Sequence, residues 1–248
     1  MLTRAFRRSC KSVTSTILEP DQIADWVSEQ LTHDLILNLS GKSEAAQYDL
    51  SGNVMKRTEI LRSKFTEKQL RSLMEHGKYL HLDKKGLDDF DILVVARTLR
   101  FMNQSCELLD VNGNPIGDFG FDHITKHVVP FTPLKSLFAS GCLLSDTSIS
   151  SLVGPWIRND ALSVLELRNN MISDKGAVEL AEAILENKFE REITIYLSGN
   201  KISDEGAVAL TKAVMSKIAP LKIWLPQNTQ ISQEAKDEIM KYTKNVRF

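Results

Sequence analysis

The amino-acid sequence predicts an α/β fold of the solenoid type, in which short strand–helix units stack side by side. One set of seven positions recurs after thirty residues, and each copy runs from an alternating apolar segment through Asn to an Asp-x-Gly helix start. A period of this length indicates stacked units, because one unit cannot bury its apolar face alone. The first copy comprises Leu165, Leu167, Asn170, Ile172, Asp174, Gly176 and Leu180, and the second comprises Ile195, Leu197, Asn200, Ile202, Asp204, Gly206 and Leu210.

The same register extends to earlier parts of the chain in steps of 28 and 29 residues. Five well-formed units begin at positions 80, 109, 137, 165 and 195, and a degenerate unit lies at each end. Two units depart from the pattern, because Lys85 and Cys142 replace the Asn while Asp91 and Ser148 replace the Gly. We expect these replacements to alter local turns and to leave the architecture intact.

Each element of a unit has its own local signal. Leu165 and Leu167 alternate with Glu166, which is the period-2 pattern of a strand with one buried face. The following Asn170 is suited to satisfying backbone groups where the chain leaves the strand. Ser and Asp then precede the helix, where they are N-cap candidates and favourable at the positive end of the helix dipole. In the unit that begins at 165, the apolar helix stripe is predicted at Val178, Ala181 and Leu185.

The repeats divide the chain into four parts. Residues 1–19 form a basic N-terminal segment, which is either a targeting sequence or a disordered tail. Residues 20–76 are predicted to form a helical cap with a degenerate first repeat, and Thr66 and Gln69 have the spacing of a capping box. We expect this cap to cover the free edge of the first strand. Residues 77–222 hold the five repeats, and 223–248 form a C-terminal capping repeat and helix.

The two clearest units resemble leucine-rich repeats of the ribonuclease-inhibitor type. The runs that carry this resemblance extend from Leu165 to Ala181 and from Ile195 to Leu210, and the similarity covers roughly residues 45 to 240. The resemblance implies a curved right-handed solenoid, a horseshoe arc with parallel strands on its concave face and helices on its convex face. It also implies that the protein binds another protein, as most members of the family do.

Composition limits the compartment and the partner. The 248 residues carry a net charge of −1, which argues against binding nucleic acid by neutralising phosphates. The chain has three cysteines without motif spacing, which indicates free thiols in a reducing compartment, and no apolar run of about 18 residues that would span a membrane. An intracellular, cytoplasmic location is therefore expected. The alternatives are mitochondria, if residues 1–18 are a transit peptide, and the host cytosol, if the protein is a bacterial effector.

No arrangement of residues predicts catalysis, a metal centre or a cofactor. His123 and His127 have the i, i+4 spacing of two ligands on one helix face, but no third ligand accompanies them in the repeat pattern. We expect both to be exposed histidines on the convex face. No Ser/His/Asp or Cys/His combination suited to nucleophilic catalysis can be argued from the sequence.

The repeat register also predicts which side chains cover the concave face. Strand residues between two buried aliphatic positions must point outward, and equivalent residues of neighbouring strands lie about 4.8 Å apart. Exposed aromatic residues on a rigid face are typical anchors of protein interfaces. An alternative is that the aromatic residues stack on one another or pack beneath the C-terminal cap. The candidate partner-binding residues are His81, Asp83, Asp110, Phe138, Glu166, Arg168, Tyr196 and Trp224.

We therefore expect a non-enzymatic protein–protein interaction module, monomeric, that binds a partner protein on its concave face. Such a module acts as a scaffold, an adaptor or an accessory subunit in assembly. Two alternatives follow from the same resemblance. The protein regulates an enzyme, as an inhibitor or in the manner of a small-GTPase activator, or it is a secreted bacterial effector that binds a host protein.

Overall fold

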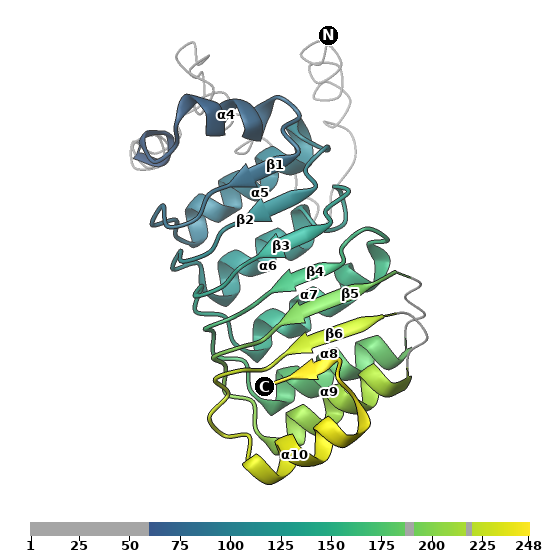
Figure 1. The fold of residues 1–248 in the computed structure, drawn as a ribbon. Coiled ribbons are helices and arrows are strands. Elements are labelled where there is room, and N and C mark those ends of the chain that lie inside the picture. Colours follow the sequence, from purple (N-terminus) through teal and green to yellow (C-terminus); the bar gives the residue numbers. More distant parts are fainter. Residues whose placement is uncertain (1–59, 187–190, 217–219) are drawn as a thin grey trace, which may run out of the picture.

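A computed structural model describes residues 60–186, 191–216 and 220–248 of the chain. The basic segment 1–19 and most of the cap expected over 20–76 lie outside the described residues. Seven parallel strands form one sheet in sequence order, β1 to β7, so each strand pairs with the strand of the next unit (Figure 1). The strands are β1 Tyr79–His81, β2 Leu108–Asp110, β3 Ser136–Phe138, β4 Val164–Glu166, β5 Ile193–Tyr196, β6 Leu221–Trp224 and β7 Val246–Arg247.

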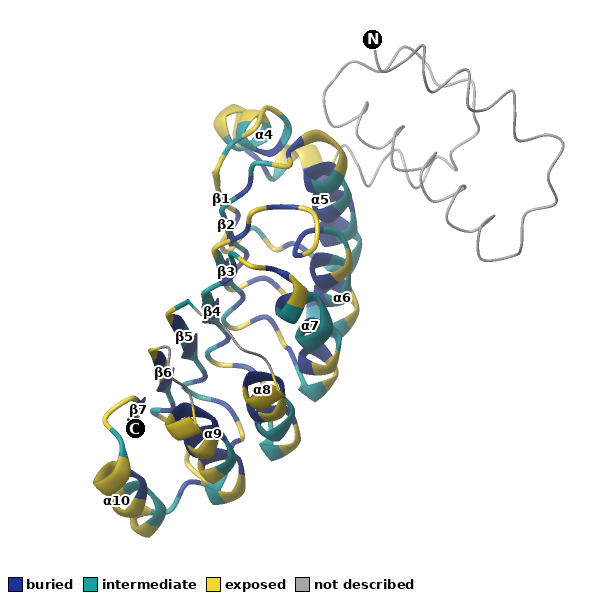
Figure 2. Ribbon diagram, turned by 90° about the vertical axis from the view of Figure 1, so that its right-hand side faces the viewer, coloured by how far each residue is buried: buried dark blue, intermediate teal, exposed yellow. Residues whose placement is uncertain are grey.

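Helices alternate with the strands and lie on one side of the sheet. This leaves the other side, called the sheet face below, uncovered by any of the described helices (Figure 2). Parallel neighbours require such a crossover helix between successive strands. The order confirms the predicted α/β solenoid of stacked strand–helix units. The helices are α4 Glu67–Met74, α5 Asp89–Met102, α6 Gly117–His127, α7 Asp146–Arg158, α8 Asp174–Glu186, α9 Asp204–Ser216 and α10 Gln233–Tyr242.

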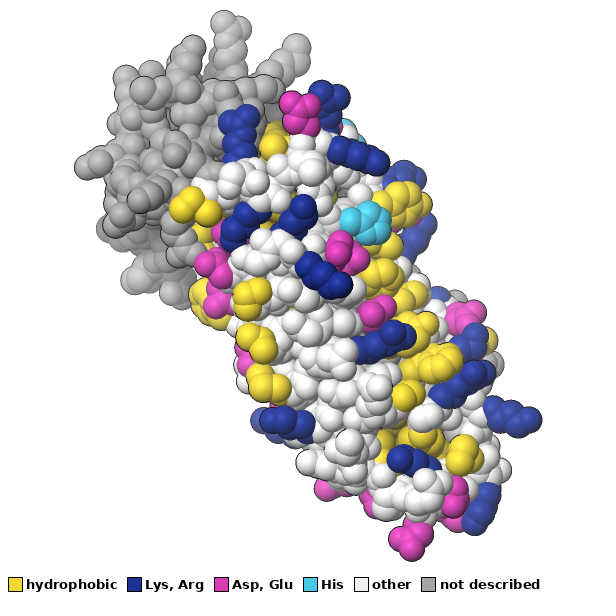
Figure 3. Space-filling model, turned by 60° about the vertical axis from the view of Figure 1, so that its left-hand side comes forward, with side chains coloured by type: hydrophobic (Ala, Val, Ile, Leu, Met, Phe, Trp, Pro, Cys, Tyr) yellow, Lys and Arg dark blue, Asp and Glu magenta, His cyan; other side chains and the backbone are white. Residues whose placement is uncertain are grey.

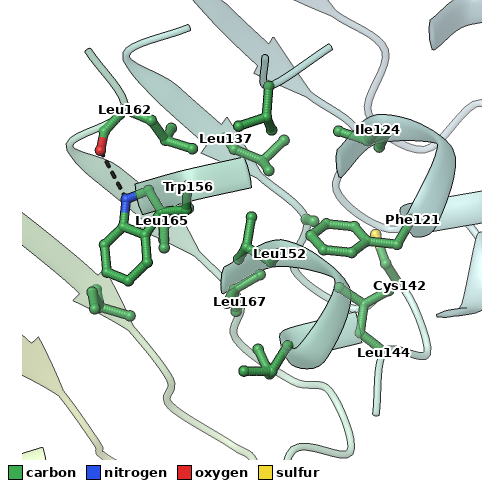
Figure 4. Packing of buried hydrophobic residues seen from close by; sticks show 14 of the residues in the cluster. Phe121, Ile124, Leu137, Cys142, Leu144, Leu152, Trp156, Leu162, Leu165 and Leu167 are labelled. Carbon is green, nitrogen blue, oxygen red and sulfur yellow. Dashed lines mark hydrogen bonds between the residues drawn. The ribbon is translucent and has the colours of Figure 1, made fainter. Parts of the chain in front are cut away.

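The pairing register of the sheet agrees with the repeat register of the sequence. Leu165 pairs with Leu137 on one side and with Ile195 on the other, and all three are fully buried. Between the sheet and the helices, the aliphatic side chains of neighbouring units form one continuous core. Figure 4 shows its middle part, where Trp156 of α7 lies among Leu residues of β3 and β4 and donates a hydrogen bond from Nε1 to the carbonyl of Leu162 (3.0 Å).

Buried asparagines connect the units beyond the strands. The Nδ2 of Asn170 donates to the carbonyls of Ala139 and Leu167, and its Oδ1 accepts from the backbone N–H groups of Cys142 and Leu144. One amide thus satisfies backbone groups of two successive units, which are shielded from water and would be costly to leave unpaired. Asn114, Asn200 and Asn228 make equivalent contacts.

The turn after each strand requires a left-handed backbone conformation. This conformation is accessible to glycine without steric cost and is tolerated by Asn. Glycine or Asn occupies four of the six equivalent turns, and Lys84 and Gln227 occupy the outermost two. The φ angles are 52° at Lys84, 68° at Gly113, 64° at Gly141, 54° at Asn169, 69° at Gly199 and 62° at Gln227.

The departures from the repeat pattern have local explanations. Cys142, which replaces an Asn, donates its thiol to the carbonyl of Val111 (3.2 Å), and therefore keeps one of the contacts of the amide. Ser148, which replaces a Gly, donates its hydroxyl to Asp118 (2.5 Å). Asp91, in the first unit, forms an ion pair with Lys64 (2.6 Å) and completes a capping box with Asp88. Cys142, Ser148 and Asp91 therefore each have a defined partner.

Helix α4 covers the outer edge of β1. Gln69 donates to the carbonyl of His81 (2.6 Å) and Ser72 donates to that of Tyr79 (3.1 Å), so side chains of α4 bond to backbone carbonyls of β1 at the edge that none of the described strands pairs with. The helix begins with the predicted capping box of Thr66 and Gln69. At the opposite end, α10 is followed by β7, a strand that the repeat register did not predict.

The apolar stripe predicted for α8 was partly wrong. Ala181 is buried, but Leu185 is 46% exposed near the end of the helix, and Ile184 is buried in its place. The residues of α8 that face the core are Gly176, Ala177, Leu180, Ala181, Ala183 and Ile184. Small side chains at several of these positions let the helix approach the sheet closely.

Candidate functional site

One column of outward residues runs across the whole sheet face. Strand pairing places His81 beside Asp110, and the same register continues through β3 to β6 and ends at β7. The sheet face runs down the right-hand side of Figure 3, where hydrophobic side chains alternate with basic and acidic ones. Over the described strands the column consists of His81, Asp110, Phe138, Glu166, Tyr196, Trp224 and Arg247.

The structure divides the predicted site residues into two groups. In the N-terminal group, His81 and Asp83 are exposed, and Nδ1 of His81 lies 3.7 Å from Oδ2 of Asp110. The other oxygen of Asp110 accepts a hydrogen bond from the backbone N–H of Asn112 (3.0 Å). Asp110 is therefore held in place by its own turn, while His81 remains largely open to solvent.

The C-terminal group is a continuous set of stacked side chains. The rings of Tyr196 and Trp224 lie 5.9 Å apart at an interplanar angle of 26°. The guanidinium of Arg168 lies 4.4 Å from the centre of the Tyr196 ring, and that of Arg247 lies 4.8 Å from the centre of the Trp224 ring. Both rings remain partly exposed. We call these four residues the aromatic–arginine ladder.

The alternative arrangement considered for the aromatic residues holds for one pair. Tyr196 and Trp224 do stack on each other along the sheet. Phe138 is separated from them by Glu166, which lies between it and Tyr196 in the column. Glu166 accepts a hydrogen bond from Ser140 (3.1 Å) and lies 3.9 Å from Arg168.

Arg247 is a site residue that the sequence analysis missed. Tyr196 and Trp224 are 28 residues apart, but Arg247 follows Trp224 by fewer residues than this. The repeat register therefore does not extend to Arg247. The carbonyl of Arg247 accepts a hydrogen bond from Leu225 (2.7 Å), which holds its backbone against β6. No signal in the repeat pattern marks this position.

A second missed feature lies where the strands begin. Glu107 precedes β2 and forms ion pairs with Lys78 and Lys135, each at 2.8 Å. Lys78 precedes β1, and Lys135 precedes β3. The hydrogen bonds from Lys135 and Lys78 lower the pKa of Glu107 to about 2. The carboxylate therefore bridges three successive units at one margin of the sheet face.

The two histidines of α6 are not the exposed pair that we expected. His123 and His127 are half-buried, their rings stack 5.9 Å apart, and Arg100 donates to Nδ1 of His127 (3.1 Å). Burial, together with the neighbouring Arg97 and Arg100, lowers the pKa of His127 to about 4. In the described part of the chain, no group of three or more His, Cys, Asp or Glu side chains is placed to hold a metal ion.

Comparison with known proteins identifies the repeats. Residues 159–181 and 194–210 match the family described as Leucine Rich repeat. Over 77 residues the chain is 31% identical to the ribonuclease inhibitor of Mus musculus, a match that covers 31% of this chain and 17% of that protein. Together with the register of the sheet, these matches identify the chain as a leucine-rich repeat protein with ribonuclease-inhibitor-like units. The match to the ribonuclease inhibitor spans far less than two thirds of the length of that protein.

A solved structure also aligns with the fold. It is that of Leiomodin-1 Actin-Binding Site 2, with a TM-score of 0.47, 15% sequence identity, and coverage of 62% of this chain and 88% of that one. Leucine-rich repeat domains are typically protein-binding modules. None of the described helices is long and apolar enough to cross a bilayer.

Proposed function

We propose that this protein is a non-enzymatic module that binds a partner protein on its sheet face and acts as a scaffold, adaptor or accessory subunit. One observation carries this proposal: a single column of the sheet aligns Phe138, Tyr196 and Trp224 with charged side chains, and all of them remain accessible. The strands beneath the column are fixed by the buried core and by the asparagine contacts. A rigid surface of this kind loses little conformational entropy when it binds.

The proposed binding residues are those of the sequence analysis together with Arg247. Aromatic residues and arginines dominate the energetics of protein interfaces, particularly where neighbouring contacts exclude water from them. The mixed charges of the sheet face favour a specific partner, because unmatched charges would be penalised on binding. The proposed binding residues are His81, Asp83, Asp110, Phe138, Glu166, Arg168, Tyr196, Trp224 and Arg247.

We further propose that residues 77–222 form the binding unit and that the flanking segments close its ends. The contacts of α4 with the edge of β1 support a capping role for the N-terminal side, and α10 with β7 supports one for 223–248.

Cys106 and Cys142 are buried free thiols, and burial raises their pKa values to about 12 and about 11. These thiols support a reducing, intracellular location.

Affinity capture with matched variants tests the proposal. The wild-type protein, Phe138→Ala and Tyr196→Ala are immobilised and incubated with cell extract, and Met215→Ala serves as the control. Met215 is 54% exposed on α9, on the helical side of the molecule. Proteins that bind the sheet face are retained by the wild type and the Met215 variant and are depleted from the other two.

The retained proteins are quantified by mass spectrometry, and circular dichroism checks that each variant is folded. Both sheet-face substitutions remove partly exposed side chains, so we expect the fold to persist. If both variants retain every partner of the wild type, the sheet face is not the binding surface.

A further inference from the structure

The aromatic–arginine ladder has hydrogen-bond donors that its own neighbours do not fill. The Nε of Arg168 is shielded from solvent and has no hydrogen-bond partner in the described part of the chain. Its Nη1 lies 3.9 Å from Oε1 of Glu166, which is too long for a hydrogen bond, and that oxygen already accepts from Ser140. Glu166 therefore reduces the charge around Arg168 without occupying its donors.

Contact with an aromatic ring restricts the position of both guanidinium groups. A guanidinium that lies with its face on an aromatic ring keeps its N–H groups at its edge, where they form paired hydrogen bonds to a carboxylate. Arg247 is exposed, and no carboxylate lies within ion-pair distance of it among the residues that the structure describes. The ladder thus presents one guanidinium at each end and an aromatic pair between them.

We propose that the aromatic–arginine ladder binds an extended acidic segment of the partner protein, with one carboxylate on Arg168, another on Arg247 and an apolar side chain over Tyr196 and Trp224. This inference rests on the proposed function, because it specifies the chemistry of the partner at the same face. The N-terminal group supports the placement: Asp83 and Asp110 would repel an acidic segment, which is therefore directed to Arg168 at the end of β4 and to β5, β6 and β7.

The geometry also specifies the spacing of the acidic residues. Neighbouring strands are about 4.8 Å apart, and the two guanidiniums flank a pair of rings on adjacent strands, so they are separated by roughly 10 to 15 Å. An extended chain advances about 3.3 Å per residue and returns to the same side every second residue. Two acidic residues four positions apart, about 13 Å, fit this separation.

A peptide array tests the proposal with the full-length protein. Each peptide has a Ser/Thr background, a central Leu and two Glu residues separated by two to six positions, and matched peptides carry Gln or Lys in place of Glu. A single-stranded oligonucleotide of similar length is the competing probe, because arginines and aromatic rings also stack on bases. Hits are remeasured by fluorescence anisotropy at low and high salt.

We expect the Glu peptide with four-residue spacing to bind about tenfold more tightly than its Gln counterpart, with a loss at high salt. Arg168→Gln and Arg247→Gln should each weaken binding about fivefold or more, and Arg168→Lys should weaken it to a smaller extent. The control Arg158→Gln removes one positive charge from an exposed position on α7, and it should leave peptide binding unchanged.

Three results would overturn the inference: no preference for Glu over Gln or Lys peptides, full binding by both arginine variants, or tighter binding of the oligonucleotide. Phe138 and Arg247 separate this inference from the proposed function, since Phe138 lies outside the ladder. If Phe138→Ala loses partner proteins while acidic peptides show no preference, the sheet face binds proteins and the acidic segment is wrong. If acidic peptides bind through Arg247 but Phe138→Ala and Tyr196→Ala retain every partner, the ladder binds acidic peptides and the proposed function of the sheet face is wrong.

Discussion

The carboxylate of Asp174 holds Ser203 of the following unit by two hydrogen bonds, from its backbone N–H (2.8 Å) and its hydroxyl (2.6 Å). The same carboxylate accepts the N–H of Gly206 (2.9 Å). Asp174 therefore acts at the start of the next helix, whereas the sequence analysis assigned it to the start of its own. Equivalent contacts join Asp118 to Ser145, Asp146 to Ser173 and Asp204 to Ser232.

Replacing this acid tests how strongly the units are coupled. Asp174→Asn should lower the free energy of unfolding by about 2 kcal/mol, because the amide NH₂ meets donors where an oxygen accepted them. Glu182→Gln on the exposed side of α8 is the control and should change stability by less than about 0.5 kcal/mol. Urea unfolding monitored by circular dichroism measures both. Equal stability of the two variants would mean that the contact contributes nothing.

Asn170 and Cys142 occupy the same repeat position, so they can be compared directly. Asn170→Ala should cost about 3 kcal/mol, because four hydrogen bonds to buried backbone groups are lost. Cys142→Ala removes one thiol donor and a small volume, and should cost about 1 kcal/mol. The comparison is made by chemical denaturation under reducing conditions. A larger loss for the cysteine variant would contradict the assigned role of the amide.

Two helical glycines should respond to alanine to different extents. A Cβ at Gly206 would lie 2.6 Å from Oδ1 of Asp174 and 2.9 Å from Cβ of Ala177, so Gly206→Ala should destabilise by about 1 to 3 kcal/mol. At Gly154 the nearest atom outside its chain neighbours is 3.6 Å away, at the end of Arg158, but Pro155 disfavours a Cβ on the residue before it in a helix. This penalty opposes the gain in helix propensity, so Gly154→Ala should cost less than Gly206→Ala. Melting temperatures of both variants check the difference.

The ion pairs of Glu107 predict an acid-dependent contribution to stability. Its pKa of about 2 in the folded chain lies below the usual value of about 4.3. The contribution is therefore complete above about pH 4.3 and is lost as the pH falls towards 2. A carboxyl NMR titration should show the low midpoint, and Lys135→Met should raise it. Lys244→Met is the distant control, and a wild-type midpoint near 4 would rule out the bridge.

The strand register could be predicted from the sequence because its evidence is contained within each strand. The spacing of the aliphatic residues indicates both the buried face of each strand and the offset between units, as at Leu137, Leu165 and Ile195. The pairing in the sheet follows that offset. For the same reason the outward column was correctly aligned up to Trp224.

Contacts between units were harder to predict, because a local pattern does not show where a side chain reaches. Asp174 has the features of a helix cap, yet it contacts the next unit. His127 was expected to be exposed, but it is half-buried, and Arg100 of the preceding unit donates to its Nδ1 (3.1 Å). Arg247 was missed because the last connection is shorter than a repeat. These are effects of three-dimensional neighbours, which one sequence does not record.

The units that begin at 137, 165 and 195 each carry both partners of the Asp–Ser contact, an acid for the unit that follows and a serine for the unit that precedes. The gene can therefore gain or lose a whole unit between Asp174 and Ser203, and each of the two side chains would still have a hydrogen-bond partner in the neighbouring unit. Such duplications would lengthen the arc in fixed increments and move the two ends of the molecule apart, which gives evolution a simple means of matching its span to differently sized targets.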